Sequence, residues 1–215
     1  MNTWTVSLFA IASLAHAGTV IDQIAVTVGR HAIKTSDIDR DLRVTQFLNS
    51  QAPDISPTQR RIAIQRLIDQ ELIRNELAQA GSTSSLTSEA KELLDMIRAE
   101  RFHGSDAEMA AELRRRGLSE DVLLEAVQWQ LTVLRFIDQR FRLGIVVTDD
   151  DIGAYYKQHE AELKRKYPGN DTLEALTPRI RDLLEGERIN RAFEEWLQQA
   201  RKNARIEFKL SELTG

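Results

Sequence analysis

The side chains that most often bind metals or carry protons near neutral pH are few and widely separated in this sequence. After Ala17 the histidines are His31, His103 and His159, and the chain contains no cysteine. The separation of the histidines gives no metal-ligand spacing, and a chain without cysteine has no thiolate nucleophile, thiolate metal site or disulfide. We therefore interpret the three histidines as solvated surface residues and expect no metal ion or other cofactor.

Three clusters of charged residues could suggest ion or phosphate binding. The acidic run at residues 149–151 lacks the alternation, the glycine and the final glutamate of an EF-hand loop, and its place favours the first turn of a helix. The basic runs at residues 114–116 and 164–166 have no interleaved aromatic residues, and the formal net charge of the chain is -4. We interpret all three runs as solvated helix ends and loops, and we expect no nucleic-acid partner.

No catalytic motif connects the remaining polar residues. The sequence has neither a Walker-type glycine loop for a nucleotide phosphate nor a Gly-x-Ser-x-Gly elbow for a serine nucleophile. These absences predict a protein that acts without ATP and is not an enzyme. Binding through apolar surface is the activity that remains.

The composition is typical of a folded, largely helical chain. Of the 215 residues, 29% are charged and 42% are hydrophobic, and this length fits one large domain or two small ones. The segment 1–17 combines an apolar run with a small-x-small end, so it resembles a secretory signal peptide, although it contains no lysine or arginine. A buried N-terminal helix is the alternative. No segment reaches the roughly 20 apolar residues of a spanning helix, so we expect no stable membrane insertion.

Hydrophobic periodicity predicts a mainly α-helical fold with one small sheet. Alternating apolar residues within 20–33 predict a β-hairpin, and a terminal strand around Ile206 and Phe208 is expected to pair with it. Residues 145–147 also resemble a short strand. Helices are expected at residues 35–49 (capped by Thr35 or Ser36), 56–81, 87–104, 105–117, 119–141 and 148–163, followed by a closing helix that begins at Thr177 and Pro178.

The predicted helix at residues 56–81 carries apolar residues on two nearly opposite sides, so neighbours must cover it twice. The helix at 119–141 is also apolar on more than one face. We predict that such helices frame an apolar groove for extended polypeptide, and the alternative that all these side chains are ordinary core stays open. The candidate peptide-binding residues are Met96, Phe102, Met109, Leu113, Trp129 and Phe136.

Four short motifs follow one another in a known order. They are VGRHAIKTSDI at 28–38, RLIDQELI at 66–73, VTDDDIGAYY at 147–156, and the closing pair Trp196-Leu197 with ARI at 204–206. Together they resemble the SurA-type periplasmic chaperones, a family related to the parvulin-type peptidyl-prolyl isomerases. The resemblance covers nearly all of the chain after Ala17, with Gly29 where the family commonly has Asn. It implies that the closing helix and strand return to complete a helical N-terminal domain.

One departure from the family concerns catalysis. Relatives carry a parvulin domain before the closing helix, whereas only the short segment 164–176 separates Leu163 from Thr177 here, too little for any domain. We therefore predict a signal peptide at 1–17 and a single SurA-like domain at 18–215, made of a helical part (18–147), a linking helix (148–163) and a closing helix and strand (177–210).

The function that this resemblance implies is that of a periplasmic, ATP-independent chaperone without isomerase activity. Its expected partners are unfolded polypeptides or outer-membrane protein clients. A non-enzymatic subunit that docks one dedicated envelope partner is the alternative, and self-association as a homodimer is left open.

Overall fold

The computed structural model describes residues 22–79 and 86–210, most of which are helical. The expected fold class, mainly α with a small sheet, is confirmed. In chain order the elements are β1 (Ile24–Val28), β2 (His31–Lys34), α1 (Thr35–Leu48), α2 (Pro57–Gln79), α3 (Thr87–Phe102), α4 (Asp106–Arg115), α5 (Glu120–Phe141), the 3-10 helix η1 (Arg142–Gly144), α6 (Asp149–Lys166), α7 (Leu173–Asn203) and β3 (Ile206–Phe208).

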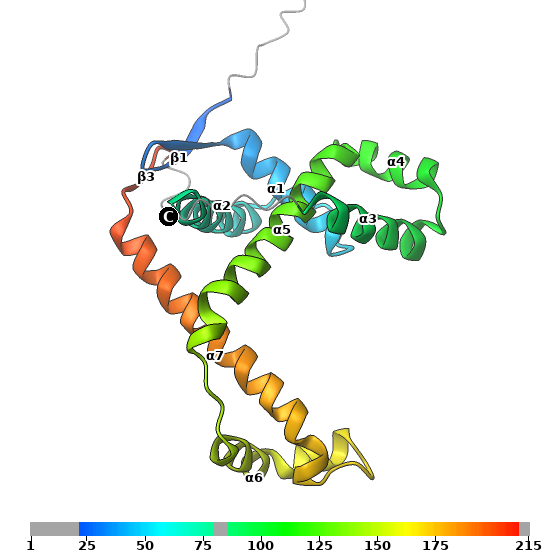
Figure 1. Cartoon of the computed structure of the whole chain (residues 1–215). Helices are drawn as coiled ribbons and strands as arrows, with labels where there is room; N and C mark the ends of the chain where they lie inside the picture. Colours follow the sequence, from blue (N-terminus) through cyan, green and yellow to red (C-terminus); the bar gives the residue numbers. More distant parts are fainter. Residues whose placement is uncertain (1–21, 80–85, 211–215) are drawn as a thin grey trace, which may run out of the picture.

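The sheet joins the two ends of the described chain, as the sequence predicts. Its strand order is β2-β1-β3, and both pairings are antiparallel. Val28 lies opposite His31 on one side and opposite Ile206 on the other. Gly29 turns the hairpin at a φ of 60°, where a side chain would be strained, and its amide donates to the Arg205 carbonyl at 2.8 Å. Figure 1 shows β3 returning beside β1 after the long excursion through α7.

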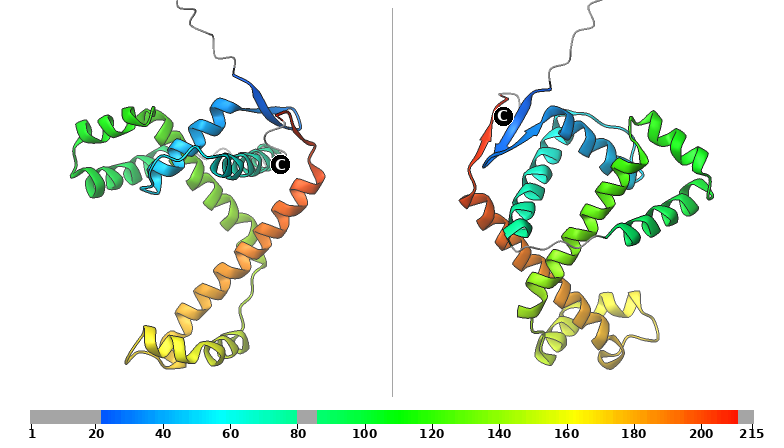
Figure 2. Two further views of the ribbon diagram at one scale, coloured as in Figure 1. Left: turned by 180° about the vertical axis from the view of Figure 1, so that it is seen from behind. Right: turned by 45° about the horizontal axis from the view of Figure 1, so that its top comes forward.

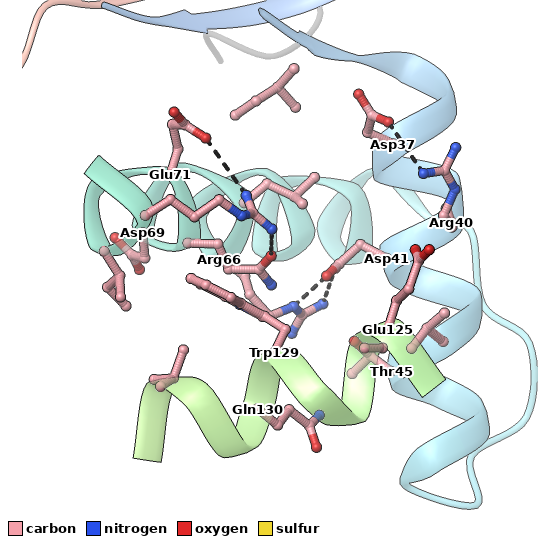
Figure 3. A pocket seen from close by; sticks show the side chains of 18 of the residues that line it. Asp37, Arg40, Asp41, Thr45, Arg66, Asp69, Glu71, Glu125, Trp129 and Gln130 are labelled. Atoms are coloured by element: carbon pink, nitrogen blue, oxygen red, sulfur yellow. Dashed lines mark hydrogen bonds and ion pairs between the residues drawn. The ribbon is translucent and has the colours of Figure 1, made fainter. Parts of the chain in front are cut away.

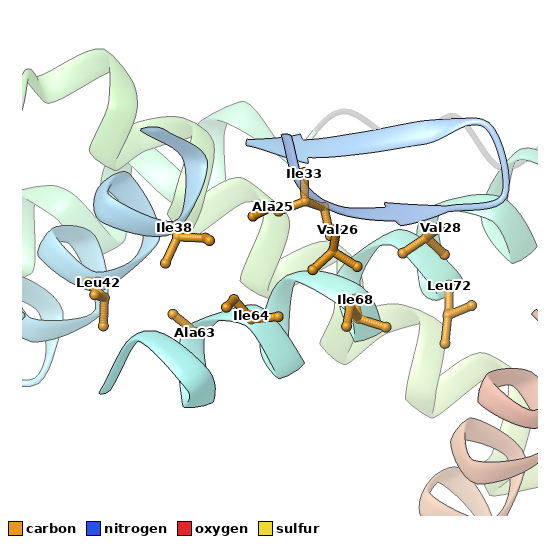
Figure 4. Close-up of a cluster of buried hydrophobic side chains, with 10 residues drawn as sticks. All are labelled: Ala25, Val26, Val28, Ile33, Ile38, Leu42, Ala63, Ile64, Ile68 and Leu72. Atoms are coloured by element: carbon orange, nitrogen blue, oxygen red, sulfur yellow. The ribbon is translucent and has the colours of Figure 1, made fainter. Parts of the chain in front are cut away.

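The first core lies between this sheet and α2. Val26 and Val28 of β1 point towards Ile64 and Ile68 of α2, and all four side chains are at most 2% exposed (Figure 4). The α1 side chains drawn in the same view extend this cluster.

The second apolar side of α2 is covered only in part. Ile73, near the C-terminal end of the helix, is buried, whereas Ile62, near its start, is 48% exposed. The predicted double coverage of this helix therefore holds towards its C-terminal end alone.

A second core joins α3 and α4 to α1 and α5. Phe47 of α1 and Leu123 of α5 are fully buried there, and the Phe47 ring stacks on Phe102 at a centroid distance of 6.2 Å. Two of these helices begin where the sequence predicts, at 105 and 119, since the hydroxyls of Ser105 and Ser119 accept from backbone amides in the first turn of α4 and α5.

Helices α5 and α7 cross near the middle of the molecule, and α6 lies at the end remote from the sheet (Figures 1 and 2). The crossing is filled by four aromatic side chains, which we call the aromatic junction: Phe136, Phe141, Phe193 and Trp196. Beyond it, Ile152 of α6 packs with Leu176 and Ile180 of α7 in a third core. Nearer the sheet, the Arg201 side chain fastens α7 to α2 by donating to Asp69 at 2.6 Å.

Three local predictions were wrong. The residue that caps α1 is Lys34, because the hydroxyls of Thr35 and Ser36 donate instead to the Asp22 carboxylate. The closing helix begins at Leu173 with Thr172 as its cap, and Pro178 lies inside it, just after the first turn.

The third error concerns residues 145–147, which are extended but belong to no strand. The guanidinium groups of α7 bind their carbonyls: Arg188 donates to the Val146 oxygen and Arg181 to the Val147 oxygen, the latter at 2.8 Å. These carbonyls are therefore satisfied without a neighbouring strand.

Some predictions lie outside the described residues, namely the signal peptide at 1–17 and the helix end at Gly81. Within the parts of the chain that the structure does describe, no helix is long and apolar enough to cross a membrane.

Candidate functional site

A large groove is bounded by β2, α1, α2 and α5 (Figure 3). Its volume is about 870 Å³, within the range typical of ligand sites. The groove forms because α5 crosses over α1 and α2 at a distance from the sheet, and the side chains in between do not fill the space. The residues that line it include His31, Ile33, Asp41, Arg66, Leu67, Glu71, Ile73, Arg74, Glu125, Trp129, Val133 and Leu134.

Apolar side chains line two facing walls of the groove. On α5, Trp129, Val133 and Leu134 face it, and Leu134 is 64% exposed to solvent. On α2, Leu67 and the buried Ile73 lie on the opposite wall. Leu134 and Trp129 therefore present apolar surface that the rest of the protein does not cover and that a ligand could cover.

An ion pair joins two of the helices that line the groove. Arg66 of α2 donates two hydrogen bonds to one carboxylate oxygen of Asp41 of α1, at 2.9 and 2.7 Å. The Asp41 side chain is only 11% exposed, so this pair is better shielded from water than an ordinary surface ion pair. The pair fixes the spacing between α1 and α2 and leaves Arg66 satisfied.

A second polar group surrounds Trp129. The Arg74 guanidinium lies 4.5 Å from the centroid of the Trp129 ring, which is a cation-π geometry, and it donates to Gln70 at 3.2 Å. Arg74 also approaches the Glu71 carboxylate, with 3.6 Å between the nearest nitrogen and oxygen. Figure 3 shows Glu71 on the side of α2 that faces the sheet, and Trp129 reaching from α5 towards Arg66 on the other side.

The rim of the groove includes the edge of the sheet. β2 is an outermost strand, and no described strand pairs with its other side. Its consecutive residues His31, Ala32 and Ile33 all line the groove. Successive side chains of a strand point to opposite faces of the sheet. Three consecutive residues can therefore line the same groove only where the groove reaches the edge of the strand. An unpaired strand edge is a template for an added extended chain.

The six predicted peptide-binding residues do not form one site. Trp129 alone lines the groove. Met109 and Leu113 are at most 2% exposed in the second core, and Phe102 packs against that core. Phe136 belongs to the aromatic junction, and Met96 is 55% exposed on α3, away from the groove. The spacing of apolar residues therefore identified one wall residue and could not separate it from core residues.

The groove residues that sequence reasoning missed are mainly charged. Asp41 comes from α1, and Arg66, Glu71 and Arg74 come from α2. For the three α2 residues, the signal that could have found them is the presence of acidic and basic residues among the apolar positions of residues 66–74, within a long regular helix.

Residues of the charged runs at 149–151 and 114–116 form hydrogen bonds within the fold. The Thr148 hydroxyl and the Asp151 carboxylate form a capping box at the start of α6. Arg116 donates to Glu112 at 2.6 Å, and this hydrogen bond lowers the pKa of the Glu112 carboxyl. Among the described residues, no three carboxylate or histidine side chains are placed to hold a metal ion.

Comparison with known proteins adds no assignment. No protein-family model matches the chain, and no curated protein matches it. The inference of function therefore depends on the groove itself. Its shape, its apolar walls and its strand edge suit a ligand that is extended, partly apolar and able to form backbone hydrogen bonds.

Proposed function

We propose that the protein is an exported, ATP-independent chaperone, similar to the SurA type and without isomerase activity, that holds unfolded or outer-membrane polypeptides in the groove. The observation that carries the proposal is the meeting of an unpaired strand edge with the apolar walls of α2 and α5. An unfolded polypeptide offers both complements, a backbone for the edge of β2 and apolar side chains for Trp129 and Leu134.

The energetics of such binding favour reversible holding. A segment that buries about 400 Å² of apolar surface gains about 10 kcal/mol at roughly 25 cal/mol/Å². Loss of rigid-body freedom and ordering of the segment cost roughly 4 to 15 kcal/mol. The surplus is small, so clients bind weakly, are released without ATP, and are selected by general character more than by exact sequence.

The proposal is tested by suppression of aggregation. The purified protein, at several-fold molar excess, is mixed with a denatured outer-membrane protein on dilution from urea, and light scattering is followed. Trp129→Ala removes the largest apolar wall residue, so the concentration needed for half-suppression should rise about tenfold, the effect of losing about 1.4 kcal/mol of binding. Met96→Ala is the matched control, because Met96 is exposed but lies outside the groove.

The outcomes separate this proposal from a dedicated assembly subunit. No suppression by the unaltered protein, or equal loss in the Trp129 and Met96 variants, would count against a client groove. Saturable binding of one folded envelope protein at fixed stoichiometry, with no effect on unfolded clients, would favour docking to a single partner. A proline-isomerisation rate above background would contradict the non-enzymatic part of the proposal.

A further inference from the structure

Glu71 is a buried carboxylate that the protein leaves incompletely satisfied. The residue is 5% exposed, and its Oε2 atom is inaccessible to solvent and has no hydrogen-bond partner among the described residues. A buried carboxylate without donors carries a large desolvation cost. Its position on α2 at the groove makes it available to a donor that a ligand brings.

The two cationic side chains nearest to Glu71 do not complete it. His31 of β2 and Arg74 of α2 each approach Oε2 at 3.6 Å, which is beyond a good hydrogen bond. Both side chains are largely exposed, at 54% and 44%, so either can move aside. Without a ligand, Arg74 is also in contact with Trp129 and Gln70.

The remaining charges of the groove also leave a negative excess. Arg66 is bound to Asp41, and Arg40 lies 3.8 Å from Asp37. Glu125 on α5 is exposed and forms no ion pair with any described residue. The formally charged groups that line the groove are the carboxylates Asp37, Asp41, Asp69, Glu71 and Glu125, and the arginines Arg40, Arg66 and Arg74. Asp69 is bound by Arg201 of α7, so Glu125 is the one carboxylate of this set without an ion pair to a described residue.

We propose that the groove selects extended segments in which a lysine or arginine is flanked by apolar residues. The basic side chain donates to Oε2 of Glu71 in place of His31 or Arg74. Glu125 of α5 adds a second negative charge at the end of the groove beside α1 (Figure 3), and the apolar neighbours of the basic residue cover Trp129 and Leu134. This inference rests on the proposed function, because it specifies which polypeptide segments the same groove prefers. Acidic segments are disfavoured, since they would add a negative charge beside a carboxylate that is already poor in donors.

The test uses matched synthetic peptides and the purified protein. A fluorescein-labelled, unstructured peptide of a dozen residues carries a central lysine between leucine and phenylalanine residues, and two further peptides replace the lysine by glutamine or by glutamate. Fluorescence anisotropy gives the dissociation constants. The lysine peptide should bind about tenfold more tightly than the glutamine peptide, as one charge-assisted hydrogen bond in a shielded site predicts, and the glutamate peptide should bind more weakly still.

Protein variants locate the effect. Glu71→Gln should remove most of the preference for lysine over glutamine, and Glu125→Gln should reduce it about twofold to threefold. Glu125 is exposed, so its variant keeps the test decisive if Glu71→Gln does not fold. Glu100→Gln is the control, because Glu100 is an exposed carboxylate of α3 outside the groove, and it should leave the preference unchanged.

The possible results separate the two proposals. Equal affinity for the three peptides, with aggregation still suppressed in a Trp129-dependent way, would overturn the charge preference and leave the chaperone proposal standing. Failure of all three peptides to bind, together with no suppression of aggregation, would overturn both. A lysine preference that survives both groove variants would place the cation elsewhere and overturn the role of Glu71.

Discussion

Replacement of Phe136 by alanine should separate a structural role at the aromatic junction from a role in ligand binding. The Phe136 side chain is 7% exposed and packs edge-to-face against Trp196 at 5.3 Å and against Phe141 at 6.0 Å. Burial of a phenylalanine side chain is worth about 2 kcal/mol relative to exposure, and each lost aromatic pair adds about 0.5 to 1.5 kcal/mol. The free energy of unfolding should therefore fall by about 3 to 5 kcal/mol, the range found when large core residues are truncated.

The assay is urea unfolding followed in parallel by tryptophan fluorescence and circular dichroism. Trp196 lies in the junction and contributes to the fluorescence together with Trp129, whereas the dichroism signal reports all helices. Phe136→Leu is the control, because it keeps most of the apolar volume and should cost less than about 1.5 kcal/mol. If the free energy of unfolding of the alanine variant falls by less than about 1 kcal/mol while client binding weakens, the structural role is refuted. Phe136 would then be a ligand-binding residue.

Two further predictions concern a helix cap and a turn. The hydrogen bond from Arg188, with those from the Thr148 amide and hydroxyl, lowers the pKa of Asp151 to about 2, so its stabilising contribution is full above the unfolded value near 4 and disappears as pH falls towards 2. The urea midpoint of Asp151→Asn should therefore lie below that of the unaltered protein at pH 6, and the two midpoints should converge near pH 2. Asp150→Asn, which alters an exposed neighbour, should have the midpoint of the unaltered protein at every pH. A gap between Asp151→Asn and the unaltered protein that does not change with pH would contradict the pairing of Asp151 with Arg188. Gly117→Ala should cost about 1 to 3 kcal/mol, because Gly117 has a φ of 64° and its added Cβ would lie 2.7 Å from Nη1 of Arg43. Gly144→Ala, with no atom within 4 Å of the added Cβ, should change thermal stability by less than about 0.5 kcal/mol, and equal melting temperatures for the two variants would argue against strain at Gly117.

The elements that local chemistry determines could be predicted from the sequence. Ser105, Ser119 and Thr148 each cap a helix through an amide in its first turn, so the signal is local. The hairpin and its pairing with the last strand could also be predicted, because the apolar alternation of β1 and β3 has period 2 and each strand needs a partner.

The errors have both distant and local causes. Residues 145–147 have strand-like composition, yet Arg181 and Arg188, far along the chain in α7, satisfy the carbonyls that a neighbouring strand would otherwise bind. Pro178 looked like a first helical residue, but the hydroxyl of Thr172 already caps the helix before it. Tertiary contacts such as those of the two arginines leave no mark on local periodicity.

The same limit applies to the site. Trp129 could be proposed as a wall residue because a helix with surplus apolar positions must expose some of them. Met109 and Leu113 looked equivalent, yet they are enclosed in the core that α3, α4 and α5 share. The pairing of Arg66 with Asp41 and the unsatisfied oxygen of Glu71 depend on the distances between helices, which a single sequence does not contain.

The order of the strands also constrains when the protein can become native. β1 is the central strand, and one of its two partners, β3, lies at the opposite end of the described chain. During synthesis from the N-terminus, the hairpin and α2 can form early. The edge of β1 that pairs with β3 stays unpaired until almost the whole described chain has been synthesised. Such distant closure is slow, and it should give a kinetic phase that vanishes when Ile206–Phe208 is removed. During that interval the unpaired edge of β1 is open to other chains. The protein should therefore refold with less association between its own copies when it is dilute.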